Sequence, residues 1–160
     1  MPASASAAGR TQTQLAADYT SDGDLVPPGF EWETTYKGKQ VLLRWGRANA
    51  TITAGEACIL VTPSTSVAHD SYTPAGTGVT KATAVKAGVA QAAMAAGDWG
   101  YFAVKGYTPA YIVGSVSAGD LLETVDTGFT DNTAVIADIY AVPSAASSGS
   151  ELVDCWVDCE

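Results

Sequence analysis

Short apolar runs separated by glycine-containing turns are the feature that most limits what this chain can fold into. In residues 40–45, Val41, Leu43 and Trp45 share one face, and Gln40 and Arg44 share the other. A period of two is that of a half-buried strand, and several such strands bounded by turns predict an all-β sandwich or barrel. The candidate strands are residues 40–45, 57–62, 99–105, 110–113, 120–125, 133–142 and 151–157.

The alanine-rich segment 82–96 fits this pattern least well. Its composition favours a helix by intrinsic propensity, but Gly88 lies in its middle and costs about 1 kcal/mol relative to alanine there. Val85, Val89 and Met94 form only a thin apolar stripe. We therefore expect a strand around residues 85–91, followed by a turn or a single short helical turn.

A tripeptide of alanine, glycine and an acid occurs three times, each time just before an apolar run. Glycine can adopt a left-handed backbone conformation, and the following carboxylate can accept hydrogen bonds from turn amides. The pattern predicts three turns that lead into strands and has no functional meaning of its own. The copies are residues 54–56, 96–98 and 118–120.

The N-terminal segment differs from the rest of the chain. Residues 1–24 are small and polar with no apolar period, and a Pro-Pro-Gly sequence at 27–29 is followed by Phe30, Trp32 and Tyr36. We expect an extended arm and aromatic anchor over residues 1–36 and a β-barrel body over 37–160. The first ten residues lack the basic start and apolar stretch of a signal peptide, which predicts synthesis in a cytoplasm.

Charge and composition argue against several kinds of partner. The chain of 160 residues has a formal net charge of −9, and only 16% of its residues are charged. Its lysines and arginines are scattered, whereas phosphate backbones and anionic membranes require clustered basic residues. We therefore expect neither nucleic-acid nor membrane binding.

The chain shows no convincing catalytic constellation. Its one histidine, His69, is followed by Asp70, but sequence neighbours in an extended segment point to opposite faces, and no Gly-x-Ser-x-Gly elbow presents a serine. The other apparent phosphate, glycosylation and sugar-hydrolysis patterns are too weak to assign. We expect no enzymatic activity.

Metal binding and a disulfide framework are also poorly supported. An odd number of cysteines, Cys58, Cys155 and Cys159, does not suggest a disulfide framework, and one distant histidine completes no paired zinc spacing. Two acidic clusters lack the fixed spacing of a calcium loop, so solvated acids are favoured over a calcium site. We expect no cofactor. The clusters are Asp18, Asp22 and Asp24, and Asp154, Asp158 and Glu160.

The order of motifs resembles that of a known family. Residues 86–106, continuing through 111–114 to 118–122, and the closing region 134–157 are similar to the capsid decoration, or cement, proteins encoded beside the major capsid gene of tailed phages. The resemblance spans about residues 40–157. It implies a small β-barrel or β-tulip-like body bound to the outer surface of an expanded icosahedral shell, with the major capsid protein as partner and a homotrimer as the favoured oligomer.

The role implied by this resemblance needs adhesive side chains, and tryptophan and tyrosine dominate interface hot spots. We expect Leu25, Phe30, Trp32 and Tyr36 to contact the shell. The candidates for contacts between subunits are Trp99, Tyr101, Tyr107 and Tyr111. The alternative is a glycan- or receptor-binding β module of a phage head or tail fibre, which exposed aromatic side chains would serve equally well.

Overall fold

The predicted all-β, barrel-like fold is confirmed. The computed structural model describes residues 29–61, 70–76, 86–125, 128–131 and 140–159, and every regular element in them is a strand. No helix capable of crossing a membrane occurs in this part of the chain. The strands are β1 (Glu31–Tyr36), β2 (Lys39–Ala48), β3 (Ala57–Leu60), β4 (Ser71–Pro74), β5 (Ala87–Ala90), β6 (Trp99–Ile112), β7 (Leu122–Val125), β8 (Gly128–Asp131), β9 (Tyr140–Pro143) and β10 (Glu151–Asp158).

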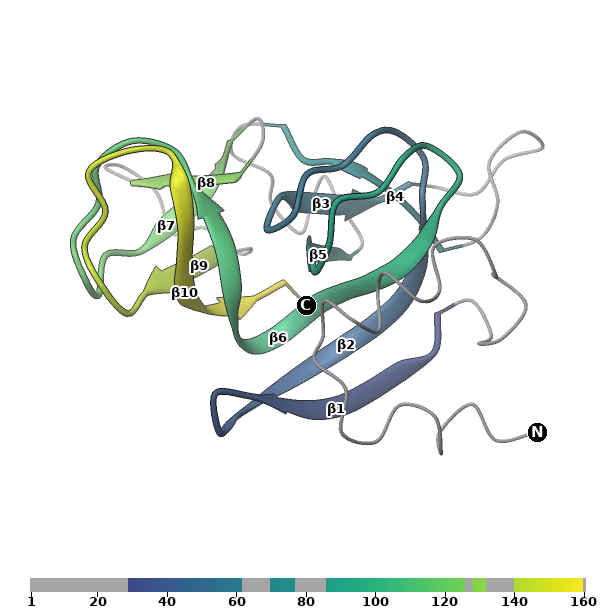
Figure 1. Cartoon of the computed structure of the whole chain (residues 1–160), viewed down its shortest axis with the longest axis horizontal. Coiled ribbons are helices and arrows are strands. Elements are labelled where there is room, and N and C mark those ends of the chain that lie inside the picture. Colours follow the sequence, from purple (N-terminus) through teal and green to yellow (C-terminus); the bar gives the residue numbers. More distant parts are fainter. Residues whose placement is uncertain (1–28, 62–69, 77–85, 126–127, 132–139, 160) are drawn as a thin grey trace.

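The long strand β6 joins two closed rings of strands. One ring runs β2-β4-β3-β5-β6 and closes through the β2–β6 pairing, and the other runs β6-β10-β9-β7-β8 and closes through β6–β8. In Figure 1 the strands β7 to β10 gather on the left of β6 and β3 to β5 on the right. The two rings therefore form one body, because the first half of β6 belongs to one ring and the second half to the other.

Each ring is filled by buried side chains from its strands. In the first ring Tyr72 of β4 stacks on Phe102 of β6 with 4.0 Å between the ring centroids. This cluster also contains Ala48, Ile52, Cys58, Ala90 and Met94. Phe129 of β8 takes the place of Tyr72 in the second ring, beside Ile112, Val116, Leu122 and Cys155.

The two rings share one topology. Strands β2 to β6 correspond in order and in pairing direction to β6 to β10, including the one parallel pairing of each ring, which is β2–β4 in the first and β6–β8 in the second. The register agrees as well. Ala103 of β6 lies opposite Leu43 and Val89, and its equivalent, Trp156 of β10, lies opposite Tyr107 and Val142. The body is thus an internal repeat whose two copies share a strand.

The three Ala-Gly-acid turns adopt the same structure, as predicted. Their glycines have φ angles of +80° at Gly55, +99° at Gly97 and +88° at Gly119. In each turn the carboxylate accepts a hydrogen bond from the backbone N–H three residues earlier, a local bond that satisfies a turn amide. The N···O distances are 2.6 Å for Thr53–Glu56, 2.9 Å for Ala95–Asp98 and 2.6 Å for Ser117–Asp120.

Comparison of the two rings adds one residue to the turn motif and shows a fourth, equivalent turn with a different sequence, at residues 148–151. The residue before each turn forms an isolated bridge across its ring, Ile52 with Met94 in the first and Val116 with Ser147 in the second. After Ser147 the chain turns again through Gly149, and the Ser147 hydroxyl donates to Glu151 at 2.8 Å. The sequence motif therefore marks equivalent positions in the two rings.

Most predicted strands are present, with some boundaries changed. Residues 40–45, 57–62, 120–125 and 151–157 overlap β2, β3, β7 and β10, and the expected strand near 85–91 is β5. Residues 99–105 and 110–113 belong to a single strand, β6. Of the predicted strand 133–142, residues 140–142 lie in β9 and the remainder falls outside the described residues. Strands β4 and β8 were not predicted, because each contains a single large apolar side chain, Tyr72 or Phe129, and so shows no apolar alternation.

The segment preceding the body forms an additional strand. Residues 31–36, the end of the expected arm-and-anchor segment 1–36, pair along their full length with β2 as strand β1. Trp32 and Tyr36 pack against the core. The part of the expected arm before Gly29 lies outside the described residues.

Candidate functional site

The catalytic candidate Asp70 is paired, and the thiols of Cys58 and Cys155 are buried. Asp70 binds Arg44 at 2.6 Å, whereas His69 lies outside the described residues. Burial raises the pKa of Cys155 to about 12 and that of Cys58 well above its ordinary value. Thiols of this kind are poor nucleophiles because the thiolate is the reactive form.

The acidic clusters do not form a metal site among the described residues. No group of three or more histidine, cysteine, aspartate and glutamate side chains lies close enough there to hold an ion. Asp154 is paired with Lys37 and Asp158 with Lys105. Glu160 and the cluster of Asp18, Asp22 and Asp24 fall outside the described residues.

Exposed apolar surface is concentrated on β10. Leu152 is 51% exposed and Trp156 45%, while Val153, Cys155 and Val157 between and beside them are buried. Alternate residues of a strand point to opposite faces, so Val153, Cys155 and Val157 line the inside of the second ring. Leu152 and Trp156 therefore belong to its outer face.

Trp156 belongs to an aromatic patch formed by Tyr36, Lys39, Tyr107 and Trp156, with Tyr107 at its centre. The centroids of the Tyr107 and Trp156 rings lie 5.2 Å apart, and those of Tyr36 and Tyr107 lie 6.1 Å apart. The Lys39 ammonium lies 3.8 Å from the Tyr107 centroid and 5.4 Å from that of Trp156, within the range of a cation–π contact. These contacts hold the indole in one orientation while almost half of its surface stays open.

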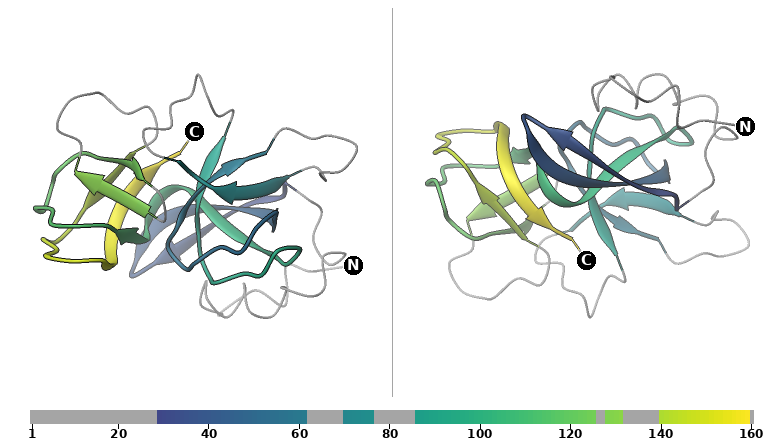
Figure 2. Two further views of the ribbon diagram at one scale, coloured as in Figure 1. Left: turned by 90° about the horizontal axis from the view of Figure 1, so that it is seen from above. Right: turned by 90° about the horizontal axis from the view of Figure 1, so that it is seen from below.

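The tip of the β1–β2 hairpin is fixed to the second ring by polar contacts. The Tyr36 hydroxyl donates to Asp154 Oδ1 at 3.0 Å, and the Lys37 ammonium pairs with the other carboxylate oxygen. Burial, followed by the hydrogen bond to Asp154, raises the pKa of Tyr36. Figure 2, in its view from below, shows the hairpin beside β10. The patch is therefore assembled from both rings.

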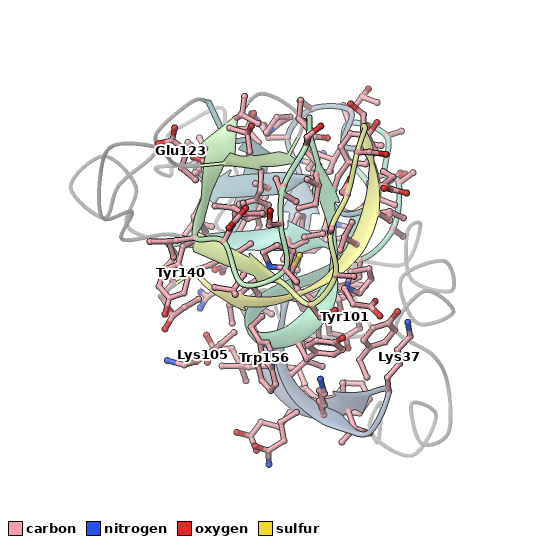
Figure 3. All side chains as sticks on the ribbon, turned by 90° about the vertical axis from the view of Figure 1, so that its left-hand side faces the viewer. Lys37, Tyr101, Lys105, Glu123, Tyr140 and Trp156 are labelled. Carbon is pink, nitrogen blue, oxygen red and sulfur yellow. The ribbon has the colours of Figure 1, made fainter. Side chains whose placement is uncertain are left out.

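Next to the patch lies a groove at the junction of the two rings, with a volume of about 390 Å³. The hairpin forms one wall, β9 and β10 form the other, and β6 forms the floor. In Figure 3 Lys105, Trp156 and Tyr140 lie near one another on this side of the molecule. The lining residues of this junction groove are Glu33, Gln40, Val41, Leu42, Lys105, Gly106, Tyr140, Trp156, Val157 and Asp158.

Gly106 makes the close approach of strands at the groove floor possible. Its φ is +105°, and a Cβ atom there would lie 2.3 Å from the Gln40 carbonyl oxygen and 2.8 Å from Val41 Cα. Real side chains do not approach backbone atoms so closely, so only glycine fits this position. At Gly106 strand β6 lies opposite Val41 of β2 on one side and Val157 of β10 on the other.

The residues predicted to bind the shell or a second subunit lie in varied environments. Phe30 is 44% exposed and lies immediately before β1. Trp32, Tyr36, Trp99 and Tyr111 are half-buried, whereas Tyr101 and Tyr107 are buried, with Tyr101 packed against Trp32 and Trp45. Leu25 lies outside the described residues. Tyr36 and Tyr107 meet in the aromatic patch, and the roles proposed for all eight remain predictions.

Sequence reasoning did not include Trp156, Leu152 and Lys39 among the site residues. A signal was available for the first two, because they alternate with the apolar residues Val153, Cys155 and Val157 and so had to point away from the core. The position of Lys39 over Tyr107 had no such signal, because the two residues are brought together only by the pairing of β2 with β6.

Comparison with known proteins identified a similar fold but no sequence family. No family model and no curated protein matches the chain. The structure is similar to the crystal structure of the head fiber gp8.5 N base of bacteriophage phi29, with a TM-score of 0.54 and 15% sequence identity. The match covers 74% of this chain and 94% of that one. At this level of identity the similarity establishes a shared fold.

Proposed function

We propose that this chain is a structural protein of a phage head that binds the outer surface of the icosahedral shell and stabilises its expanded form. Its partner is the major capsid protein, and it acts on the virion surface as a homo-oligomer, with a trimer favoured. The observation that carries the proposal is the fold shared with the head fiber gp8.5 N base over nearly that whole chain.

The chemistry of the described residues is consistent with an adhesive role. Large apolar side chains are exposed at Phe30, Leu152 and Trp156, and aromatic side chains that become buried on binding supply much of the energy at protein interfaces. A net charge of −9 favours solubility before assembly. Stabilising a shell requires binding sites that bridge its subunits. It does not require catalytic groups.

The direct test is to add the purified chain to expanded heads of the cognate phage that lack it. Cosedimentation measures binding, and calorimetry measures the melting temperature of the shell. Protein at about 100 times its Kd would stabilise each bound site by about 2.7 kcal/mol. We expect saturable binding and a higher melting temperature.

A matched pair of variants tests the predicted shell contact. Phe30→Ala and Leu121→Ala each remove a side chain that is exposed, at 44% and 36%, so both should fold normally. We expect Phe30→Ala to weaken binding to heads at least about tenfold, as for an interface hot spot, and Leu121→Ala to have no effect. Absence of binding to any expanded head would refute the proposal.

A second function is supported by the nature of the structural neighbour, which is the base of a fibre. In this alternative the chain is a glycan- or receptor-binding module of a head or tail fibre. It would then bind the particle without raising the melting temperature of the shell. The same calorimetric experiment therefore separates the two functions.

A further inference from the structure

The junction groove has the composition of a small-ligand site. Such sites are concave, commonly lie between structural units, and combine apolar walls with a few convergent polar groups. Leu42 and the exposed indole of Trp156 supply the apolar surface, and Val41 and Val157, which are 1% and 4% exposed, border the groove from the core. At about 390 Å³ the groove lies within the usual range for ligand pockets, roughly 300–1,000 Å³.

The internal repeat shows that the fold does not require the large side chains found here. The residue equivalent to Trp156 in the first ring is Ala103, which is fully buried, and by the same register the equivalent of Tyr140 is Ala87. The same strand positions are thus filled by alanine in one ring and by partly open aromatic residues in the other. Core packing does not explain the aromatic residues of the second ring.

The polar groups of the groove can both donate and accept hydrogen bonds. Glu33 and Gln40 are exposed on the hairpin wall, Tyr140 is half-buried on the opposite wall, and Lys105 pairs with Asp158 at 3.3 Å. Carboxylates accept, the ammonium donates, and the amide does both. With two carboxylates and one ammonium, the lining has a slight negative charge on a chain that is itself acidic.

We propose that the junction groove binds a neutral pyranose sugar. A pyranose ring has a C–H face of slightly positive character, which packs against the negative face of an indole. Its hydroxyl groups each donate and accept hydrogen bonds, which matches the mixed donors and acceptors around Trp156. Glu33, Asp158 and the net charge disfavour acidic sugars. This inference rests on the alternative function, a glycan-binding module, and is independent of attachment to a shell.

The experiment is calorimetric titration of the full chain with glucose, galactose, mannose, N-acetylglucosamine and maltose, with glucuronate as the charged comparison. Tryptophan fluorescence gives a second readout, because Trp156 is the exposed tryptophan among those described. We expect one-to-one saturation by at least one neutral sugar with a Kd of about 1 mM or lower. Glucuronate should bind more weakly than glucose.

Two variants of β10 locate the site. Trp156→Ala should weaken sugar binding at least about tenfold. Leu152→Ala, which removes a comparably exposed side chain outside the groove, should leave the Kd within about twofold. Gln40→Ala, at an exposed position on the opposite wall, should also weaken binding and does not depend on how Trp156→Ala folds.

Three results would overturn the proposal. They are the absence of saturation by every neutral sugar well above 1 mM, unchanged binding in both Trp156→Ala and Gln40→Ala, and tighter binding of glucuronate than of glucose. The shell-binding proposal is tested separately with Phe30→Ala, which lies outside the groove lining. A chain that binds heads but no sugar contradicts the junction-groove proposal, and a chain that binds sugar but no heads contradicts the shell-binding proposal.

Discussion

The glycines of the Ala-Gly-acid turns offer a controlled measurement, because the internal repeat places Gly55 and Gly119 at equivalent positions. Both have left-handed backbone angles, +80° and +88°. A Cβ atom at Gly119 would meet nothing within 4 Å. At Gly55 it would lie 2.2 Å from Leu152 Cδ2 and 2.9 Å from the backbone nitrogen of Tyr111. Replacing each glycine by alanine therefore separates backbone strain from steric conflict.

Gly119→Ala should lower the free energy of unfolding only through backbone strain, because the added Cβ atom meets no other atom. A left-handed residue with a Cβ costs about 1–2 kcal/mol, and restriction of the unfolded chain offsets roughly 0.4–1 kcal/mol of this. The net loss of unfolding free energy is therefore roughly 1 kcal/mol. For a chain of this size this corresponds to a fall in melting temperature of about 2–4 °C.

Gly55→Ala carries the same strain and an additional steric cost. Leu152 is exposed and can rotate away, but the Tyr111 N–H donates to the Gly55 carbonyl at 2.8 Å and fixes the distance between the turn and β6. Overpacking of this kind adds about 1–3 kcal/mol. We expect a total loss of roughly 2–4 kcal/mol in urea denaturation, twice or more the effect of Gly119→Ala.

A third variant identifies which contact is responsible. Because the conflict lies mainly with the backbone, Gly55→Ala combined with Leu152→Ala should recover less than about 0.5 kcal/mol. Equal losses for Gly55→Ala and Gly119→Ala, or full recovery in the double variant, would refute the reasoning. The first result would mean that the turn moves freely relative to β6, and the second that Leu152 is the obstacle.

Three further predictions concern stability. Burial raises the pKa of the Cys155 thiol to about 12, whereas in the unfolded chain the thiol ionises at about pH 8.5. The contribution of this thiol to the free energy of unfolding is therefore complete below about pH 8.5 and is lost as the pH rises towards 12. Urea denaturation across this interval should show a loss of about 1.4 kcal/mol per pH unit for each such buried thiol, and Cys155→Ser should have a shallower slope. The two rings should unfold in a single calorimetric transition, because β6 belongs to both; two resolved transitions in a Phe102→Ala variant would contradict this. Glu56 is 3% exposed and accepts a hydrogen bond from the Thr53 N–H, so Glu56→Ala should lower the unfolding free energy by about 1–3 kcal/mol in the same assay. The equivalent change at the half-buried Asp120, Asp120→Ala, should cost less, about 0.5–1.5 kcal/mol. Equal losses would show that burial of the carboxylate does not matter.

The sequence was a good guide where the signal is local. Alternation in residues 40–45 and 151–157 identified β2 and β10 and the faces that they bury, because side chains of a strand alternate regardless of which strand lies beside it. The Ala-Gly-acid tripeptides identified three turns with one structure, because the glycine and the carboxylate act within four residues.

Strand pairing could not be obtained in this way. The parallel contact of β2 with β4 at Ala48 and Tyr72, and the continuation of β6 past Gly106, depend on contacts between distant segments. Gly88, which made the segment 82–96 ambiguous, is explained by the fold. A Cβ atom there would lie 2.9 Å from Phe102 Cβ, so β5 can approach β6 only through a glycine.

What the sequence determined by itself is therefore the class of fold, the position of most strands and the turns between them. What only the tertiary structure decided is which aromatic residues are open. Tyr101 and Trp156 are both large aromatic residues in alternating strands, but Tyr101 is covered by Trp32 and Trp45 and is 3% exposed, whereas Trp156 is 45% exposed. The physical reason is that exposure depends on what the rest of the chain places over a strand, and that covering is supplied by segments far away in the sequence.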